Sequence, residues 1–337
     1  MIRRLRFLGL FFVRGFGDRG RRADSPADIP LLGWRDILIR VWRNGKADNL
    51  NVLAAGIAFY LFLALLPLIA STAMIYGLAT EPAQVVADMR KLIVILPEAA
   101  QGPIARRAAE VIAASRGQGW ALPSALLLTL YAGARGTRAI LAALNVIYGE
   151  GDETKFARRW GVPFGIAIGI TSVMTLALVA IALFGHLEDV VPGRTGLFRL
   201  AVRAGAWLLV TAGVGLGSAA LYRYGPVRQH ARWRWIVPGA LATTVLWLLG
   251  SFAFGIYVAN FGRFDITYGS LAAVVILQLW IYFSAFILLL GAKLNAEIEL
   301  QTMRDTTVGP ARPAGRRRAS TADGLGEIPT IAPESAE

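Results

Sequence analysis

Residues 268–292 read YGSLAAVVILQLWIYFSAFILLLGA and contain no charged side chain. A transmembrane helix needs about 20 largely apolar residues to cross a hydrocarbon core roughly 30 Å thick. Five further stretches of the sequence are long and apolar enough to do the same, and they lie at 52–79, 120–148, 160–186, 198–222 and 235–261. The pattern predicts a polytopic membrane protein with six transmembrane helices.

The composition agrees with a chain that lies largely in lipid. Of its 337 residues, 55% are hydrophobic and 17% are charged, whereas about a quarter of the residues of a soluble protein are charged. An open sheet cannot satisfy its backbone polar groups in lipid, and the short alternating segments of a membrane barrel are missing. The predicted fold class is therefore all-α, a six-helix transmembrane bundle.

The positive charges are divided unevenly between the two ends of the predicted spans. The net charge of +13 would also suit a nucleic-acid-binding protein, but the position of the charges favours a membrane protein. Twenty-three Lys and Arg residues fall in one alternating set of segments, 1–49, 149–159, 223–234 and 294–337, and eight fall in the opposite set, 80–119, 187–199 and 262–267. By the positive-inside rule the richer set, which includes both termini, is cytoplasmic. We predict a multi-pass protein of the bacterial inner membrane with cytoplasmic N- and C-termini.

Three segments outside the six spans complete the predicted organisation. Residues 1–33 are basic and are predicted to be retained, because they lack the cleavage site of a signal peptide. The membrane domain covers 34–300, and its 80–119 insert is predicted to form a small periplasmic cap of amphipathic helices. Residues 301–337 show no apolar periodicity and are predicted to be a disordered cytoplasmic tail.

The segment just before the first span is predicted to be an amphipathic helix. Trp34, Ile37, Leu38, Val41 and Trp42 recur at helical spacing, and charged residues occupy the other face. Such a helix would lie on the cytoplasmic leaflet or pack against the inner mouth of the bundle.

Four motifs resemble one protein family in their residues and their order. The first predicted span contains AAGIAFYLFLALLPLIAS, the second ends in ALNVIYG, and the last two contain PGALATTVLWLLGSFAFGIYVANF and TYGSLAAVVILQLWIYFSAFILLLGAKLNAEIE. Together they are similar to the YihY/BrkB family, also called ribonuclease BN. The resemblance implies a six-span inner-membrane protein associated with virulence or with lipids and envelope precursors. One departure is Lys293, where the family usually has an acid; Glu297 lies one turn further on and is placed to pair with it.

The second predicted span carries a polar stripe. At 100° per residue, Tyr131, Arg135, Arg138 and Asn145 fall within about 80° of one another on the helix. Ionisable side chains within a span are costly, so a function is the first hypothesis for them. The stripe would bind an anionic group such as a phosphate or carboxylate. Alternatively, the arginines bond to backbone carbonyls or to an acid elsewhere in the bundle, and Arg138 extends toward the cytoplasm.

A second polar cluster is predicted where the fifth and sixth spans meet. It consists of Tyr257, Asn260, Asp265 and Tyr268, followed by Gly269 and Ser270. Helix capping by Asp265 or Thr267 is the favoured interpretation, and ligand contact is the alternative.

Enzymatic activity is not expected, in spite of the ribonuclease name in the family. The chain has no Cys and only two His, His186 and His230, which the predicted topology places on opposite sides of the membrane, so they cannot share a metal ion. No P-loop, nucleophile elbow or HExxH motif is present. We expect no catalytic residue, metal, cofactor or nucleic-acid partner.

Two functional hypotheses remain at the level of the sequence. The first is a transporter or flippase-like protein for an anionic lipid or amphiphile, whose partners are membrane lipids. The second is a non-transporting scaffold for envelope integrity, which would act as a homo-oligomer or through an envelope partner protein. The sequence indicates neither the substrate, nor the energy coupling, nor the oligomeric state.

Overall fold

The structure is a computed structural model. It describes residues 19–78, 119–151, 161–169, 196–261 and 272–329, together with short pieces between 83 and 110 and between 171 and 176. The fold is described below for these residues only.

The described part of the chain is helical, which confirms the predicted all-α class. Its elements are η1 (Pro26–Asp28), α2 (Leu31–Ala47), α3 (Leu50–Gly77), α6 (Ala121–Tyr148), α8 (Gly196–Tyr224), α9 (Trp233–Phe261), α11 (Ala272–Glu299) and α12 (Ser320–Asp323). Among these residues, Ala231 and Thr307 form an isolated antiparallel β-bridge.

Five of these helices coincide with predicted spans. Each has 28 or 29 residues, which at 1.5 Å per residue is long enough to cross a bilayer. By length and apolar composition, three described helices qualify as membrane-spanning: Leu50–Gly77, Trp233–Val258 and Val274–Glu299. In the remaining predicted span, 160–186, residues 161–169 are helical and most of the others lie outside the described residues. The count of six spans remains a prediction.

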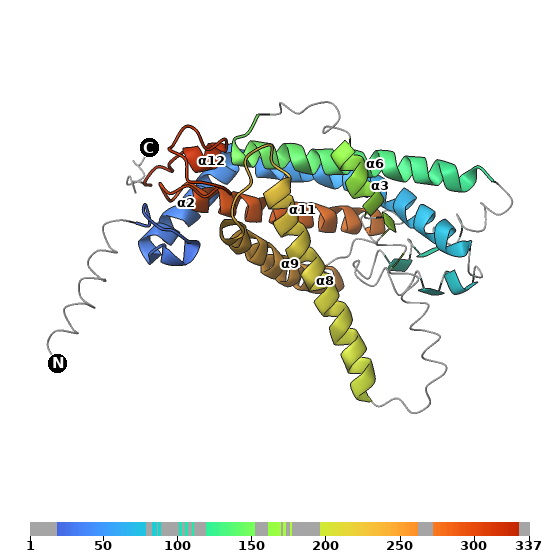
Figure 1. Cartoon of the computed structure of the whole chain (residues 1–337). Coiled ribbons are helices and arrows are strands. Elements are labelled where there is room, and N and C mark those ends of the chain that lie inside the picture. The colour runs from blue at the N-terminus through green and yellow to red at the C-terminus, as the bar shows by residue number, and fades with distance from the viewer. Residues whose placement is uncertain are drawn as a thin grey trace, which may run out of the picture.

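The long helices lie side by side as a bundle (Figure 1). α3 and α6 share the most extensive contact of any two described helices, and α11 packs against both α9 and α3. α8 runs diagonally across the others (Figure 1) and contacts α9. Neighbours such as α3 and α6 are antiparallel, because the start of α3 meets the end of α6.

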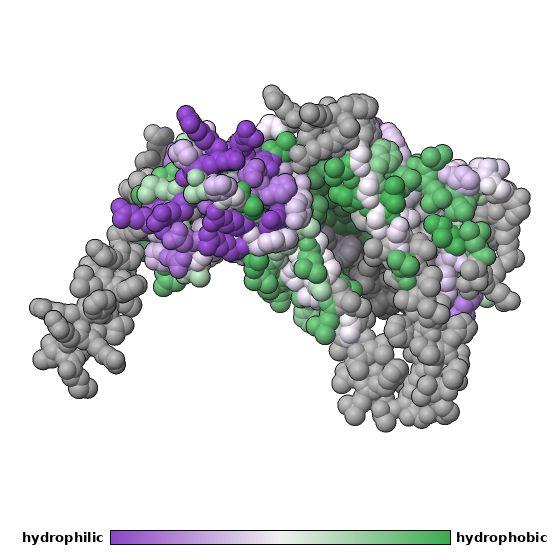
Figure 2. All heavy atoms as spheres, in the orientation of Figure 1, coloured by the Kyte–Doolittle hydropathy of each residue, from purple (hydrophilic) through white to green (hydrophobic). Residues whose placement is uncertain are grey.

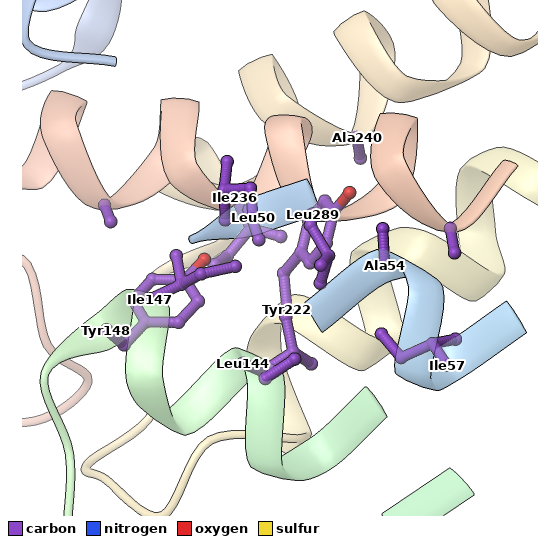
Figure 3. Close-up of a cluster of buried hydrophobic side chains, with 14 of the residues drawn as sticks. Leu50, Ala54, Ile57, Leu144, Ile147, Tyr148, Tyr222, Ile236, Ala240 and Leu289 are labelled. Atoms are coloured by element: carbon purple, nitrogen blue, oxygen red, sulfur yellow. The ribbon is translucent and has the colours of Figure 1, made fainter. Parts of the chain in front are cut away.

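The main buried core lies where the start of α3 and the ends of α6 and α8 meet α9 and α11. Leu50, Leu144, Tyr222, Ile236 and Leu289 point toward one another in this cluster (Figure 3). The Tyr222 hydroxyl lies 2.6 Å from Thr243 Oγ1 and donates to the carbonyl oxygen of Leu288 at 2.7 Å. A buried hydroxyl needs such partners, and these two join α8, α9 and α11.

The α9–α11 crossing brings two backbones into direct contact. A Cβ atom on Gly291 would overlap Thr243 Oγ1 and would lie 2.7 Å from the carbonyl oxygen of Gly239. Asn295 bridges the same two helices, because its Oδ1 accepts from Gly239 N at 2.7 Å and its Nδ2 donates to the Ile236 carbonyl at 2.9 Å. Small residues allow close approach of helices that must associate in lipid.

The end of the bundle that carries α2 and α12 is polar. Hydrophilic side chains gather there, and hydrophobic ones cover much of the visible bundle (Figure 2). We call this the polar end and define it as residues 19–49, the last turns of α6, residues 223–234, the last turns of α11 and the tail 300–329. The first and last described residues of the chain both belong to it (Figure 1).

The tail is folded on the polar end as far as residue 329, so the prediction of a disordered tail is wrong for residues 301–329. Arg317 is buried and donates to the carbonyl oxygens of Ala322 and Met303 at 2.6 and 2.8 Å. Asp305 Oδ2 accepts from Arg312 N at 2.8 Å. Burial works to raise the pKa of Asp305, but hydrogen bonds from the backbone N–H groups of Arg312 and Thr307 hold it below its ordinary value. Polar bonding, rather than apolar periodicity, orders this segment.

The helix before the first span packs against the bundle. Ile37 and Val41 are buried with Trp235 and Ile298. The predicted division of its faces is partly wrong, because Arg40 is buried on the supposed polar face and Trp42 is exposed on the supposed apolar face. Arg40 is buried because it has an acidic partner on α11, which the local pattern does not reveal.

Most of the predicted periplasmic cap lies outside the described residues. A short helical piece near residue 85 packs on α3, where Tyr76 Oη donates to Asp88 Oδ2 at 3.0 Å. The cap itself remains a prediction.

Replacing Gly291 with Ala is expected to destabilise the protein by about 1–3 kcal/mol, because the added methyl group would push α9 and α11 apart. The measurement is thermal unfolding of the purified protein in detergent or nanodiscs.

Gly255→Ala is the matched control, since a Cβ atom at this position of α9 would meet no atom within 4 Å. Equal stability of the two variants would show that the close crossing is not needed.

Candidate functional site

Arg135 lies near the middle of α6 with an exposed side chain. Its Nε and Nη2 donate to the hydroxyl oxygen of Tyr131, one turn earlier, at 3.2 and 2.9 Å. The guanidinium carbon lies 5.3 Å from the ring centroid of Tyr131 and 5.9 Å from that of Tyr60 on α3. Two tyrosine rings from neighbouring helices thus hold the cation by cation–π contact.

An apolar surface surrounds this group, which we call the arginine–tyrosine site and define as Tyr60, Tyr131 and Arg135. Leu127 and Leu128 on α6 share the helix face of Arg135 and are exposed. On α3, Phe59 and Leu63 flank Tyr60 and are exposed as well. The exposed cation of Arg135 therefore lies within an apolar surface formed by α3 and α6.

The predicted polar stripe does not act as one unit. Tyr131 and Arg135 are in contact, whereas Arg138 is half-buried and has interactions of its own. Asn145 is buried at the polar end, where its Oδ1 accepts a hydrogen bond from the backbone N–H of Val227 at 2.9 Å. Asn145 therefore fixes the loop after α8, which is a structural role. The stripe separates because the loop and tail cover only the last turns of α6.

A cavity of about 310 Å³ lies on the opposite face of α6. Its walls come from α3, α6, α11 and residues 166–171, and include Leu61, Leu65, Thr137 and Trp280. Thr129 also lines it, but its hydroxyl donates to the carbonyl oxygen of Ala125 at 2.7 Å. Arg135 is absent from the lining. The cavity is apolar and separate from the arginine–tyrosine site.

The second predicted cluster is only partly within the described residues. Tyr257 is exposed on α9, and Asn260 Nδ2 donates to the carbonyl oxygen of Ile256 in its own helix at 2.9 Å. Asp265 and Tyr268 lie outside the described residues. The capping and ligand-contact interpretations both remain predictions.

Buried ion pairs at the polar end were not foreseen from the sequence. Arg40 Nε donates to Glu297 Oε2 at 2.8 Å, and both side chains are almost fully buried. Glu297 Oε1 accepts from Asn44 Nδ2 at 2.8 Å and lies 3.3 Å from Lys293 Nζ. Lys293 also lies 2.7 Å from Asp48. The predicted Lys293–Glu297 pair is confirmed, and Asp48 joins the same lysine to the turn between α2 and α3.

A second buried pair joins the loop after α8 to α11. Arg228 binds Glu299 through two hydrogen bonds of 2.8 and 2.7 Å, and its guanidinium carbon lies 4.2 Å from the centroid of the Tyr148 ring. Thr321 from the tail donates to the same carboxylate at 3.2 Å. Burial works to lower the pKa of Arg228, but the Glu299 carboxylate holds it above its ordinary value. Arg228 therefore stays charged.

Glu150 follows α6 and joins the tail to this end of the bundle. The backbone N–H of Ser320 donates to its Oε1 at 2.8 Å. Burial raises the pKa of the Glu150 carboxyl, and the bond from Ser320 opposes that effect. This group titrates closer to neutrality than an exposed glutamate.

A weak sequence signal for these pairs did exist. Glu297 and Glu299 lie within seven residues of the end of an uncharged span, where α11 continues to residue 299 instead of stopping at 292. Their partners come from residues 40 and 228, however, and no local spacing connects positions that far apart.

No group of three or more His, Cys, Asp or Glu residues that could hold a metal ion occurs among the described residues. His230 packs its ring against Tyr224, with centroids 5.1 Å apart. His186 lies outside the described residues, so the predicted separation of the two histidines is untested.

Three known proteins show the range of similarity. The ribonuclease-like protein YfkH of Bacillus subtilis is 28% identical over 181 residues, which cover 53% of this chain and 66% of the relative. A UPF0761 membrane protein of Pseudoalteromonas translucida is 28% identical over 142 residues, 42% of this chain and 43% of the relative. One from Psychromonas ingrahamii is 36% identical over 95 residues, 28% of this chain and 32% of the relative.

The chain thus spans less than two thirds of each of these relatives, and no solved structure matches it. The family model described as virulence factor BrkB matches residues 41–316. This match includes the five long described helices, both residues of the Arg228–Glu299 pair and residues 301–316 of the tail, and it begins one residue after Arg40. The chain is therefore a membrane protein that belongs to the BrkB virulence factor family.

Proposed function

We propose that the protein handles an anionic lipid or amphiphile of the cell envelope, in the manner of a transporter or flippase. The observation that carries the proposal is the exposed guanidinium of Arg135, held between Tyr60 and Tyr131. Arg is suited to binding phosphate or carboxylate through two parallel hydrogen bonds.

The position of Arg135 along α6 supports a role beyond anchoring a resting lipid headgroup. The residue is the fifteenth of the 28 in α6, so about 20 Å of helix lies on either side of it. A lipid headgroup at rest lies at the edge of the hydrocarbon core rather than at its centre. A headgroup would meet Arg135 only while crossing, and the arginine would then lower the free energy of its charged state.

The apolar cavity is the reason why we place the route of the crossing headgroup on the outer surface of the bundle. Its hydroxyl groups on Thr129 and Thr171 already donate to backbone carbonyls in their own helices. The cavity lining contains no charged side chain, so it provides no cation for an anionic headgroup. We propose that the headgroup moves along the α3–α6 face, with its chains remaining in the bilayer.

A scaffold for envelope integrity is the second candidate, and the folded polar end favours it. The tail is held there by Glu299, Glu150 and Arg317, so it would present a defined surface to an envelope partner protein or a second copy. This candidate requires no function for Arg135.

The topology is part of the proposal: six spans in the inner membrane, with the polar end in the cytoplasm. It is supported by the 23 to 8 division of basic residues. Reporter fusions at residues 100 and 155 are expected to report periplasm and cytoplasm respectively. The reverse assignment would overturn the proposed orientation.

We also propose that the protein is not a ribonuclease, because the sequence offers only His186 and His230 as imidazole ligands for a metal. Purified protein is expected to show no RNA cleavage above background, and a His186→Ala/His230→Ala variant should give the same trace. Cleavage that copurifies with the wild type and is lost in the variant would contradict this expectation.

Substitution of Arg135 is the main test of the proposed function. We expect Arg135→Gln to insert and fold normally but to lose anionic-lipid transfer in reconstituted vesicles, because no cation then meets the headgroup. Arg135→Lys should retain part of the activity, since it keeps the charge but not the planar fork. The readout is the movement of a fluorescent phosphatidylglycerol between leaflets.

Two controls separate ligand binding from stability. Tyr131→Phe removes the hydroxyl that accepts from Arg135 and should have an intermediate effect. Arg22→Gln removes the same charge from an exposed site at the polar end and should have none. Full transfer by well-folded Arg135→Gln protein would leave the scaffold as the better explanation.

A further inference from the structure

We infer that the polar end carries a second binding site, for the phosphate of an anionic lipid, built from Arg223, Tyr224 and Trp233. The site lies where α8 ends and α9 begins, and it is separate from Arg135. It does not depend on transport.

The three side chains form one packed group. Arg223 lies in the last turn of α8. Its guanidinium carbon lies 4.4 Å from the centroid of the Trp233 ring and 5.5 Å from that of Tyr224. The two rings are edge-to-face with centroids 6.3 Å apart, and the His230 ring packs against Tyr224 with centroids 5.1 Å apart. Aromatic rings thus fix the guanidinium in place by cation–π contact.

The guanidinium lacks the acceptors that its neighbours have. Arg223 Nε and Nη1 are buried and have no hydrogen-bond partner. By contrast, Arg228 binds Glu299 twice, and Arg232 Nε donates to the carbonyl oxygen of Thr307 at 2.9 Å. Buried donors without acceptors are unfavourable, and more so when the group is charged. An oxyanion that accepts from Arg223 would remove this penalty.

No carboxylate of the described residues forms an ion pair with Arg223, and its surroundings favour an external anion. The segment 223–234 contains four arginines and no acidic residue. A planar guanidinium binds phosphate and carboxylate through two parallel hydrogen bonds. Basic segments next to membrane helices attract anionic lipids.

The aromatic residues favour a lipid phosphate over a soluble one. Tyr224 and Trp233 are each about half exposed, and Val237 and Leu241 continue the exposed surface along α9. Trp and Tyr concentrate at the boundary between hydrocarbon and water. This arrangement places the guanidinium at headgroup depth, with an apolar helix face below it for the lipid chains. Arg223 is partly exposed but its Nε and Nη1 are buried, so a neighbouring side chain would have to shift for the headgroup to reach these two atoms.

The test measures lipid binding to the full-length protein in neutral detergent by native mass spectrometry. We expect phosphatidylglycerol to bind more tightly than phosphatidylcholine, and Arg223→Gln to weaken phosphatidylglycerol binding about tenfold, a loss typical of one charge-assisted contact. Arg316→Gln, at an exposed tail position, removes the same charge and should leave binding unchanged. Equal binding by the two variants would overturn the proposal.

Further arms identify the source of the phosphate and exclude unfolding. Inorganic phosphate should not displace phosphatidylglycerol at millimolar concentration; displacement would show a site for soluble phosphate and overturn the lipid assignment. Arg223→Lys, which keeps the charge but not the ring stacking, should show intermediate binding even if Arg223→Gln folds poorly. Wild-type affinity in a folded Arg223→Lys variant would contradict the ring-held geometry.

Repeating the series in an Arg135→Gln background separates this site from the proposed function. The loss caused by Arg223→Gln should persist in that background. If it disappears, the binding belongs to Arg135 and the second site is refuted, whatever the result of the transfer assay.

Discussion

Two carboxylates on the last turn of α11 hold the polar end of the molecule together. Glu297 binds Arg40 of α2 and lies beside Lys293, which in turn pairs with Asp48 at the end of α2. Glu299 binds Arg228. The last helix is thereby connected to the segment before the first span and to the loop after α8. These connections determine where α2 and the described part of the tail lie.

These ion pairs specify how α2 and the loop after α8 pack on α11, and they add little to the net stability of the protein. Moving two charges out of water is expensive, and the attraction between them often only offsets that cost. Removing one partner is different, because the remaining charge is buried alone. Arg40, Glu297, Arg228 and Glu299 each form two or more hydrogen bonds. Competing arrangements of α2 or the loop would leave one of these charges unpaired, so the pairs select one arrangement.

The arginines of this protein therefore serve different purposes according to their surroundings. Arg40 and Arg228 have carboxylates within 3 Å and act as structural ties. Arg135 and Arg223 are in contact with aromatic rings. A ring attracts a cation but does not neutralise it. These two side chains keep the capacity to bind an external anion, and for this reason we place the candidate ligand sites there.

The sequence by itself determined the helical class and the positions of the five long described helices, because an apolar run of this length has no other stable form in lipid. It also indicated the contact between Lys293 and Glu297, since residues four apart on a helix are neighbours. Arg135 stood out for the same local reason: a charge inside an apolar run is visible without any structure.

Only the tertiary structure decided which of the polar residues act together. Asn145 shares a helix face with Arg135, yet it is buried under the loop that contains Val227. In the sequence, Arg40 fits the charged face of an amphipathic helix. In the structure it binds Glu297, which lies 257 residues away. The tail lacks apolar periodicity and still folds, because its polar groups find partners on α11 and the loop after α8. Local spacing reports only neighbours on one helix, whereas these pairings depend on how separate helices pack.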